Sequence, residues 1–364
     1  MNEDQSINTY ASSGVDTEAA GRGLSGLLRW IAETKNFSED RGKQIVPSGF
    51  FANVLRISDN FSIAISTDGV GSKSALAQLS GDFSAIGWDC VAVNVNDVIC
   101  TGATPLALVD YIALQFPHED LLSELGRGMR DAAERASISI VGGELSQHPD
   151  TLIGPMEGYA FDISGTCIGI LENKEPITGA GIKPGDIVLG FPSNGIHANG
   201  LTLARKIFNT STSSEIDTPI KGTGNTVATE LLRPTAIYIP QVMNMMNSGV
   251  DIHGLAHISG DGLLNLLRLD AEVTYRIDNM ITIPPIFNAI QEIGKISNEE
   301  MFRVFNMGVG FCAVIPEAQV DLALSLIQNN GDDVQVIGRI EKGKRNVIVE
   351  EYSLLGERGY FVST

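Results

Sequence analysis

Residues 84–116, SAIGWDCVAVNVNDVICTGATPLALVDYIALQF, contain two long apolar segments separated by the short break TGATP. The length and spacing of the first segment favour a helix over residues 84–102. The second segment follows a proline and predicts a long strand over residues 105–116. A helix that runs directly into a buried strand indicates a mixed α and β architecture.

Two carboxylates lie within this apolar helix. Asp89 and Asn96 share one face because they are seven positions apart, and Asp97 lies about 100° further round. An ionised carboxylate is costly to bury without a partner. We therefore expect Asp89 and Asp97 to pair with a cation, to hold a chain segment or to ligate a metal. An ordinary capping or ion-paired aspartate remains the alternative for each.

The flanking chain continues the alternation of strands and helices. NVLRI and FSIAIS predict a hairpin whose turn is residues 58–60. Further segments predict a helix over residues 118–136 and strands over residues 138–143 and 161–172. The Gly- and Pro-rich stretch that begins at 172 indicates a domain boundary, which gives domains 1–172 and 173–364. The second domain shows the same alternation of predicted strands and helices, in IVLGF, LTLARKIF, EVTYRI, PPIFNAIQEI, VGFCAVI and VQVIGRI.

Length and composition agree with a chain of two mixed α and β domains. At roughly 150 residues per domain, 364 residues indicate two domains. The 25 Lys and Arg against 44 Asp and Glu leave a net charge of −19, which disfavours nucleic acid and membrane surfaces as partners. The four cysteines form no CxxC pair, so the sequence predicts a protein of the reducing cytoplasm without a disulfide framework. The start lacks the apolar core of a secretory signal.

The segment STDGVGSKS, residues 66–74, has the composition of a phosphate-binding turn. Gly69 and Gly71 allow backbone amides to turn toward a ligand, the following helix adds positive potential, and Lys73 adds a mobile cation. Asp68 resembles a metal ligand. The spacing excludes a P-loop, which needs GxxxxGK[ST]. An ordinary strand-to-helix turn is the alternative.

Glu144 follows the predicted strand ISIVGG. We expect its carboxylate to complete an oxygen-rich Mg²⁺ site with Asp68 and Asp97, since Mg²⁺ is usually held by one or two carboxylates and substrate phosphates. A glutamate in a hairpin turn is the alternative.

Two histidines lie in polar, glycine-rich segments. His197, in SNGIHANG, is a candidate for phosphate binding or proton transfer, with Asn199 beside it; the alternative is a solvated loop histidine. His257 precedes the turn SGDG that begins at Ser259, another candidate phosphate contact. Zinc is disfavoured because HGLAH lacks the glutamate of HExxH.

Together these motifs resemble the phosphoribosylformylglycinamidine cyclo-ligase family. The collinear blocks STDGVGSK, VNDVICTGATP, SIVGGE, SNGIHANG, LLRPTAIYI and MFRVFNMGVGF carry the resemblance. The first two belong also to a wider superfamily that includes thiamine monophosphate kinase and selenophosphate synthetase. The last three resemble the cyclo-ligase itself.

The resemblance implies an α+β fold with two mixed domains. In that family the N-terminal sheet is shared across a homodimer and helices cover the C-terminal sheet. The implied reaction uses Mg²⁺ and ATP to close the imidazole ring of formylglycinamidine ribonucleotide, giving aminoimidazole ribonucleotide, ADP and phosphate. The partners it implies are thus a small ribonucleotide and a second copy of the chain.

The resemblance also implies roles for individual residues. Asp97 and His197 are the catalytic candidates, and Asp68, Asp97 and Glu144 are the metal candidates. Asn199, His257 and Ser259 are candidates for the substrate; which residue moves a proton stays open. The remaining candidates contact or support ATP: Thr67, Asp68, Gly69, Gly71, Lys73, Asp89 and Asn96.

The chain departs from the family pattern in three places. A glycine-rich loop reads IVPSGFF at residues 45–51, the segment after the strand reads GGELSQHPD at residues 142–150, and Asp261 replaces a glycine. These departures keep two alternatives open. One is another ATP-dependent enzyme of the superfamily, such as thiamine monophosphate kinase. The other is a nucleotide-binding regulatory subunit without catalysis.

Overall fold

The structure is a computed structural model that describes residues 9–14, 17–34, 37, 42–357 and 359–364. Within these ranges the first sheet has six strands in the order β1-β2-β3-β6-β4-β5. Their bounds are β1 Lys43–Gln44, β2 Asn53–Ser58, β3 Phe61–Gly69, β4 Thr104–Leu114, β5 Ser139–Gln147 and β6 Phe161–Glu172.

The pairing of these strands bears out the local predictions. β2 and β3 form the expected antiparallel hairpin. β6 lies between β3 and β4 and is antiparallel to both. β5 pairs with β4 in parallel and is the edge strand. The connection from β4 to β5 therefore crosses over through a helix.

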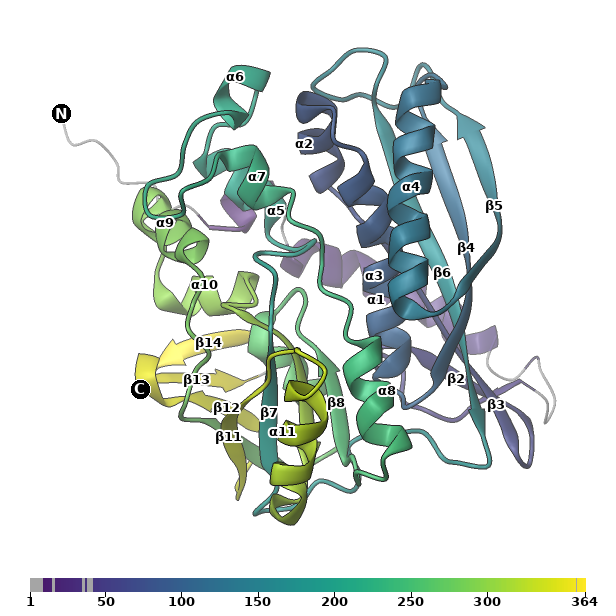
Figure 1. Ribbon diagram of the computed structural model, residues 1–364, viewed down its shortest axis with the longest axis vertical. Coiled ribbons are helices and arrows are strands. Elements are labelled where there is room, and N and C mark those ends of the chain that lie inside the picture. Colours follow the sequence, from purple (N-terminus) through teal and green to yellow (C-terminus); the bar gives the residue numbers. More distant parts are fainter. Residues whose placement is uncertain (1–8, 15–16, 35–36, 38–41, 358) are drawn as a thin grey trace.

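One face of this sheet is covered by α2 (Lys73–Ser80), α3 (Ser84–Ile99) and α4 (Glu119–Ala136) (Figure 1). α3 and α4 pack closely because glycines stand where they cross. A Cβ on Gly87 would lie 2.0 Å from the Leu125 carbonyl oxygen, and one on Gly128 would lie 1.8 Å from that of Ser84. This close contact holds α3 against the sheet, with its buried carboxylates between the two domains.

The second sheet has eight strands among the described residues, in the order β14-β13-β12-β9-β11-β7-β10-β8. Only β12 and β9 pair in parallel within these ranges. β10 is buried along its whole length, which explains its uninterrupted apolar sequence. The bounds are β7 Ile187–Pro192, β8 Gly254–His257, β9 Val273–Ile277, β10 Val309–Ile315, β11 Gln335–Lys342, β12 Asn346–Val349, β13 Leu354–Glu357 and β14 Tyr360–Ser363.

Helices pack beside the second sheet (Figure 1). They are α5 Leu201–Ile207, α6 Ser213–Ile216, α7 Val227–Leu231, α8 Ile239–Asn247, α9 Pro285–Gly294, α10 Asn298–Val304 and α11 Val320–Gln328, with the 3-10 helices η3 Gly262–Arg268, η4 Glu317–Gln319 and η5 Glu350–Tyr352. Of these helices, α6 and α7 extend from the sheet to α2 of the first domain. The N-terminal part adds η1 Ala11–Ser13 and α1 Thr17–Glu33. Two mixed sheets with helices confirm the predicted α+β class.

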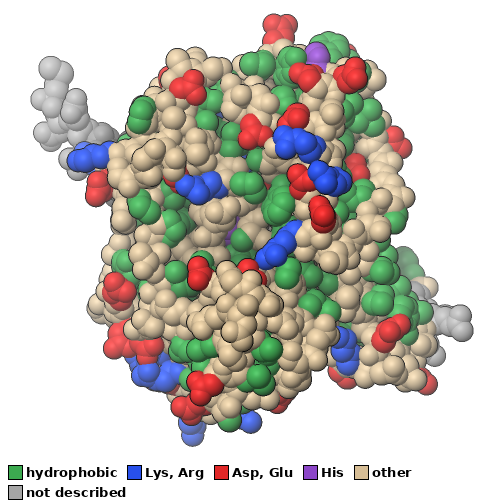
Figure 2. All heavy atoms as spheres, viewed as in Figure 1, with side chains coloured by type: hydrophobic (Ala, Val, Ile, Leu, Met, Phe, Trp, Pro, Cys, Tyr) green, Lys and Arg blue, Asp and Glu red, His purple; other side chains and the backbone are tan. Residues whose placement is uncertain are grey.

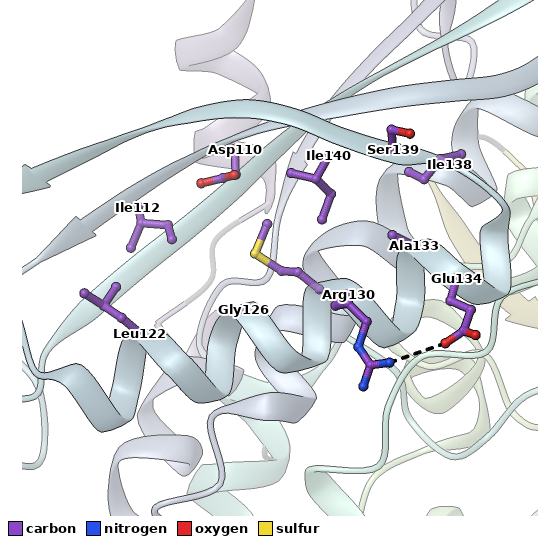
Figure 3. Close-up of a pocket in the computed structure, with 11 residues that line it drawn as sticks. Asp110, Ile112, Leu122, Gly126, Arg130, Ala133, Glu134, Ile138, Ser139 and Ile140 are labelled. Carbon is purple, nitrogen blue, oxygen red and sulfur yellow. Dashed lines mark ion pairs between the residues drawn. The ribbon is translucent and has the colours of Figure 1, made fainter.

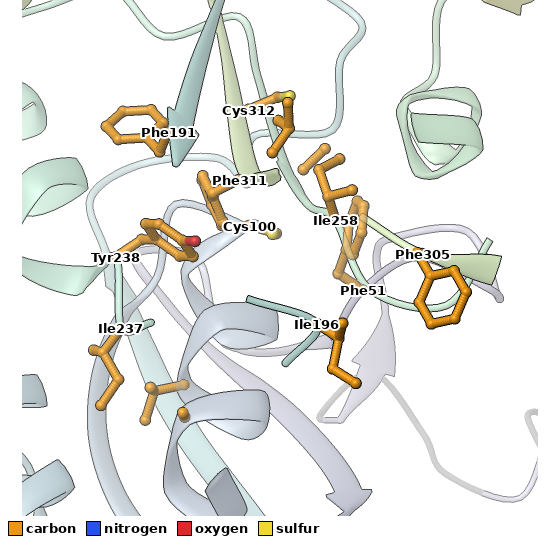
Figure 4. Packing of buried hydrophobic residues seen from close by; sticks show 14 of the residues in the cluster. Phe51, Cys100, Phe191, Ile196, Ile237, Tyr238, Ile258, Phe305, Phe311 and Cys312 are labelled. Carbon is orange, nitrogen blue, oxygen red and sulfur yellow. The ribbon is translucent and has the colours of Figure 1, made fainter. Parts of the chain in front are cut away.

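A single apolar core runs from one sheet to the other (Figure 4). Phe51 and Cys100 come from the first domain, and Phe191, Tyr238 and Phe311 come from the second. The three aromatic rings of the second domain pack with centroids 5.2 to 6.1 Å apart. The continuous core fixes the two domains against each other and so fixes any site between them.

Charges of both signs are mixed on the face of the molecule that Figure 2 shows. Figure 2 shows acidic and basic side chains interspersed over the face in view, without a single basic patch. None of the helices in the described ranges combines the length and apolarity that a membrane crossing requires.

Candidate functional site

A pocket of about 340 Å³ lies where the two domains meet. It brings together four residues that the sequence singles out: Asp68, Asp97, Asn199 and Ser259. Its other lining residues are Tyr10, Gly200, Gly260, Asp261, Arg268, Arg303 and Val304. Residues from β3, α3 and three segments of the second domain therefore converge on one space.

Three carboxylates line the pocket, and two of them, Asp68 and Asp97, lie close enough to repel each other. Asp68 stands at the end of β3, and its Oδ1 accepts a hydrogen bond of 2.8 Å from the Gly69 amide. The carboxylate is solvent-accessible, but partial loss of water in the pocket, followed by repulsion from Asp97, raises the pKa of Asp68. Two carboxylates that repel each other in this way fit a divalent cation held together with phosphate oxygens.

His257 lies behind Asp97. The histidine ends β8 and is 2% exposed, and its Nδ1 donates to Asp97 Oδ1 over 2.9 Å. Carboxylates that ligate metals commonly carry such an outer hydrogen bond, which fixes their orientation. The structure thus pairs His257 with Asp97, whereas the neighbouring Ser259 faces the pocket.

Asp89 and Asn96 hold a segment of the second domain instead of contacting the pocket. Asp89 Oδ1 accepts from the Thr235 amide over 2.6 Å. Asn96 donates to the Ala236 carbonyl over 2.8 Å and accepts from the Tyr238 amide over 3.1 Å. The prediction that Asp89 and Asn96 share one face is confirmed. Both side chains are fully buried against residues 235–238, so their role in supporting an ATP site remains a prediction.

Lys73 is not a mobile cation. Its side chain is fully buried, and its Nζ donates to Asp89 Oδ2 over 2.6 Å and to the Arg233 carbonyl over 2.6 Å. A charge in this position is stable only because Asp89 compensates it. The physical reason for the error is that Lys73 begins α2, whose first turn faces α3 and the segment around Arg233. Asp89 therefore has the cationic partner that its burial required.

The residues of the predicted phosphate-binding turn, 66–74, do not all point to the same side of the first sheet. Thr67 lies on the face of the sheet away from the helices, where its hydroxyl donates to the Gly165 carbonyl and accepts from Thr166. The Gly69 amide donates its hydrogen bond to the Asp68 side chain. Gly71 has a φ of +66°, which glycine adopts without strain.

Glu144 does not join the two aspartates within one chain. It lies on the edge strand β5 opposite Tyr111, three strands from β3, and its Oε1 accepts from the Leu145 amide over 3.0 Å. Strands are about 4.8 Å apart, so this offset is roughly 14 Å. Across the described residues no group of three His, Cys, Asp and Glu side chains could hold a metal. Glu144 therefore lies apart from the two aspartates within one chain, and its place in a metal site remains a prediction.

His197 is a buried structural acceptor. It is 2% exposed and takes a φ of +60°. Its Nε2 accepts from the Asn194 amide over 3.0 Å and from the Ala236 amide over 3.4 Å. Burial, followed by the charges of His257 and Lys73, holds its pKa well below the ordinary value. The imidazole is neutral with the proton on Nδ1, so it cannot meet a phosphate as a cation.

Three residues that line the pocket were not among the site residues predicted from the sequence: Tyr10, Arg268 and Arg303. Arg303 is paired with Glu300 through two hydrogen bonds of 2.8 Å. The Glu300 carboxylate also accepts from the Tyr10 amide over 2.8 Å, which holds the N-terminal segment against the pocket. One sequence feature could have indicated Arg268 as a site residue: it lies shortly after the SGDG turn, in a segment that forms η3.

A larger cavity of about 720 Å³ lies elsewhere, between β4, β5 and α4 (Figure 3). Asp110 is its only half-buried carboxylate, and apolar side chains such as Ile112 and Ile140 line much of it. It contains none of the residues that the motifs indicate. The smaller pocket between the domains is therefore the candidate site, because chemistry depends on convergent polar groups more than on volume.

Family models match both domains. The N-terminal domain of AIR synthase related proteins matches residues 51–171. The C-terminal domain of the same proteins matches residues 183–350. Together the two models span most of the chain.

Relatives that align with most of this chain have a more specific name than the two family models. A phosphoribosylformylglycinamidine cyclo-ligase from Methanothermobacter thermautotrophicus is 41% identical over 91% of this chain and 94% of its own length. The enzyme of that name from Pyrococcus horikoshii is 39% identical over 95% of this chain and 99% of its own. This chain belongs to the phosphoribosylformylglycinamidine cyclo-ligase family.

Solved structures show that the cyclo-ligase fold extends to more distant proteins. A hydrogenase maturation protein in complex with ATP is 20% identical, with a TM-score of 0.60 over 81% of this chain and 84% of its own. Thiamine monophosphate kinase from Aquifex aeolicus is 19% identical, with a TM-score of 0.59 over 94% of this chain and 98% of its own. At these identities the likeness establishes a shared fold and no shared substrate.

Proposed function

We propose that this chain closes the imidazole ring of formylglycinamidine ribonucleotide at the expense of ATP. The observation that carries the proposal is the convergence of Asp68, Asp97, Asn199 and Ser259 on one pocket between the domains. The chain shares 41% identity with a relative that bears the name of this enzyme, which supports the same assignment.

ATP is the proposed cosubstrate, with Mg²⁺ held by Asp68 and Asp97. The two carboxylates share the pocket, and loss of water, followed by repulsion from Asp97, raises the pKa of Asp68; a bound cation would offset both effects. When bound, Mg²⁺ would neutralise charge on the phosphates during transfer. His257 would keep the Asp97 carboxylate in place through its hydrogen bond.

The proposed reaction has two steps. The γ-phosphoryl group of ATP is transferred to the formyl oxygen, which turns that oxygen into part of a good leaving group. The amidine nitrogen then attacks the formyl carbon and loses a proton, and phosphate departs as the ring closes. The protein's task is to position the groups and complement their charge. Asn199 and Ser259 line the pocket where they can orient the ribonucleotide.

We further propose that the enzyme is a cytoplasmic homodimer. The face of the first sheet opposite the helices exposes Leu106, Val109, Tyr111 and Val141, each at least 42% accessible. An open apolar face of this kind usually meets a partner. Glu144 lies beside Tyr111 on the same face, so it could serve a metal only from a second subunit. The buried cysteines, all unpaired, suit a reducing compartment.

The test is an assay of purified protein with formylglycinamidine ribonucleotide and Mg²⁺-ATP. ADP should be released only when the ribonucleotide is present, and mass spectrometry should detect aminoimidazole ribonucleotide in equal amount. A phosphorylated, unclosed product would instead support a kinase of the superfamily. Nucleotide binding without turnover would support the regulatory alternative.

A further inference from the structure

The proposed reaction brings two anions into one acidic protein. Mg²⁺ on Asp68 and Asp97 would serve the phosphates of ATP, but the ribonucleotide carries a phosphate monoester of its own. That group needs a separate cation, since the chain has a net charge of −19. The pocket contains two arginines, Arg268 and Arg303.

The two guanidinium groups differ in what they already contact. Arg303 is engaged by Glu300 through a bidentate pair, so its charge is largely compensated. Arg268 is exposed at the end of η3, and its guanidinium lies 5.2 Å from the centre of the Phe51 ring. Throughout residues 42–357 no carboxylate forms an ion pair with Arg268.

The contact with Phe51 gives Arg268 a fixed place. Phe51 is 5% exposed and belongs to the first domain, whereas Arg268 belongs to the second. A guanidinium over an aromatic ring is held by its flat face, which leaves the edge donors directed outward. Arg268 and Asp68 line the same pocket, and the charge of Arg268 acts on Asp68, so a ribonucleotide phosphate on Arg268 would lie near the ATP that Asp68 serves.

We propose that Arg268 binds the phosphate of the ribonucleotide substrate. This rests on the proposed function and adds to it the group that recognises the phosphorylated end of the substrate. Arginine suits this task because its planar donors bind a phosphate through two parallel hydrogen bonds. Arg268 thereby distinguishes a ribonucleotide from the corresponding nucleoside.

Steady-state kinetics of Arg268→Gln and Arg268→Lys test the proposal. For Arg268→Gln, loss of a charged hydrogen bond should raise KM for the ribonucleotide about 10- to 100-fold, with KM for ATP unchanged within about twofold. Arg268→Lys should fall between Arg268→Gln and wild type, because lysine keeps the charge but binds as a point charge. Arg127→Gln is the matched control, since Arg127 lies on the surface of α4 and should change neither KM.

A binding measurement separates this proposal from the reaction itself. Titration of ribose 5-phosphate into wild-type protein without ATP or Mg²⁺ should give a calorimetric binding signal that Arg268→Gln loses and Arg127→Gln keeps. An unchanged KM for the ribonucleotide, or equal binding of ribose 5-phosphate to wild type and Arg268→Gln, would overturn the assignment. A fall in kcat alone would overturn it too, because it would place Arg268 on the transferring phosphoryl group. If wild type binds ribose 5-phosphate through Arg268 but forms no product, the proposed function fails while the phosphate site stands.

Discussion

Single hydrogen bonds decide which polar residues face the pocket. Asp97 is open to the pocket and is oriented by His257, whereas Asp89 is closed off by Lys73 and Thr235. The two aspartates have similar surroundings in the sequence, and only the direction of each side chain separates their tasks. His197 shows the same effect, because its Nε2 is occupied by two backbone amides.

The neutral state of His197 predicts a pH dependence of stability. Its folded pKa lies well below the ordinary 6.5, so as pH falls through that value the unfolded chain binds a proton that the folded chain refuses. The stabilisation that neutral His197 provides is therefore complete above pH 6.5 and decreases as the pH falls. Below pH 6.5 the free energy of unfolding should fall by up to about 1.4 kcal/mol per pH unit on account of this residue.

Urea denaturation between pH 5 and pH 7.5 measures this slope. His197→Gln should lower the free energy of unfolding at pH 7.5 and reduce its pH dependence by about one proton. His148→Gln, the same substitution just after β5, serves as the matched control. Equal slopes for wild type and His197→Gln would contradict the neutral, buried state.

At the scale of elements, α3 joins the two domains by using two of its faces. One face binds residues 235–238 through Asp89 and Asn96, and the other presents Asp97 to the pocket. The sequence predicted the helix, the shared face and β6 at residues 161–172, because apolar periodicity and spacing are local signals. It could not predict that β5 lies at an edge or that η3 brings Arg268 to the pocket, because those depend on strand order and on packing between domains.

The ion pair between α2 and α3 should matter for stability and not for ATP. Lys73→Met leaves the Asp89 charge buried without its cation and should lower the free energy of unfolding by about 3–5 kcal/mol. The exposed Arg127→Met should leave the free energy of unfolding close to that of wild type. Urea denaturation measures both variants, and kinetics at a temperature where Lys73→Met is folded should give a wild-type KM for ATP. Unchanged stability with a raised KM for ATP would restore Lys73 to the phosphate site.

At the scale of the whole molecule, one face of the first sheet has no helices packed on its exposed apolar residues within the part of the chain that the structure describes. The helices protect its other face, whereas Val109 on the open side is 42% exposed. The domain division at residues 172 and 173 remains a prediction. The strands of the first sheet end at Glu172 and those of the second begin at Ile187.

The open face predicts the outcome of a sedimentation experiment. Wild-type protein at micromolar concentration should sediment as a dimer, and Val109→Lys should sediment as a folded monomer because a charge would be buried in the interface. Leu322→Lys is the control, since Leu322 is equally exposed, at 42%, on α11 of the other domain. A monomeric wild type, or a dimer that tolerates Val109→Lys, would contradict the proposed interface.

The central claim is that the pocket between the domains, with Asp68 and Asp97 at its acidic end, is where ATP drives ring closure. The most direct measurement is kcat for aminoimidazole ribonucleotide formation by Asp97→Asn, compared with wild type under saturating Mg²⁺-ATP. We predict a loss of at least ~100-fold, because charge at the transferring phosphate would go uncompensated, with thermal unfolding close to wild type. Turnover within a few-fold of wild type in a correctly folded Asp97→Asn protein would contradict the claim.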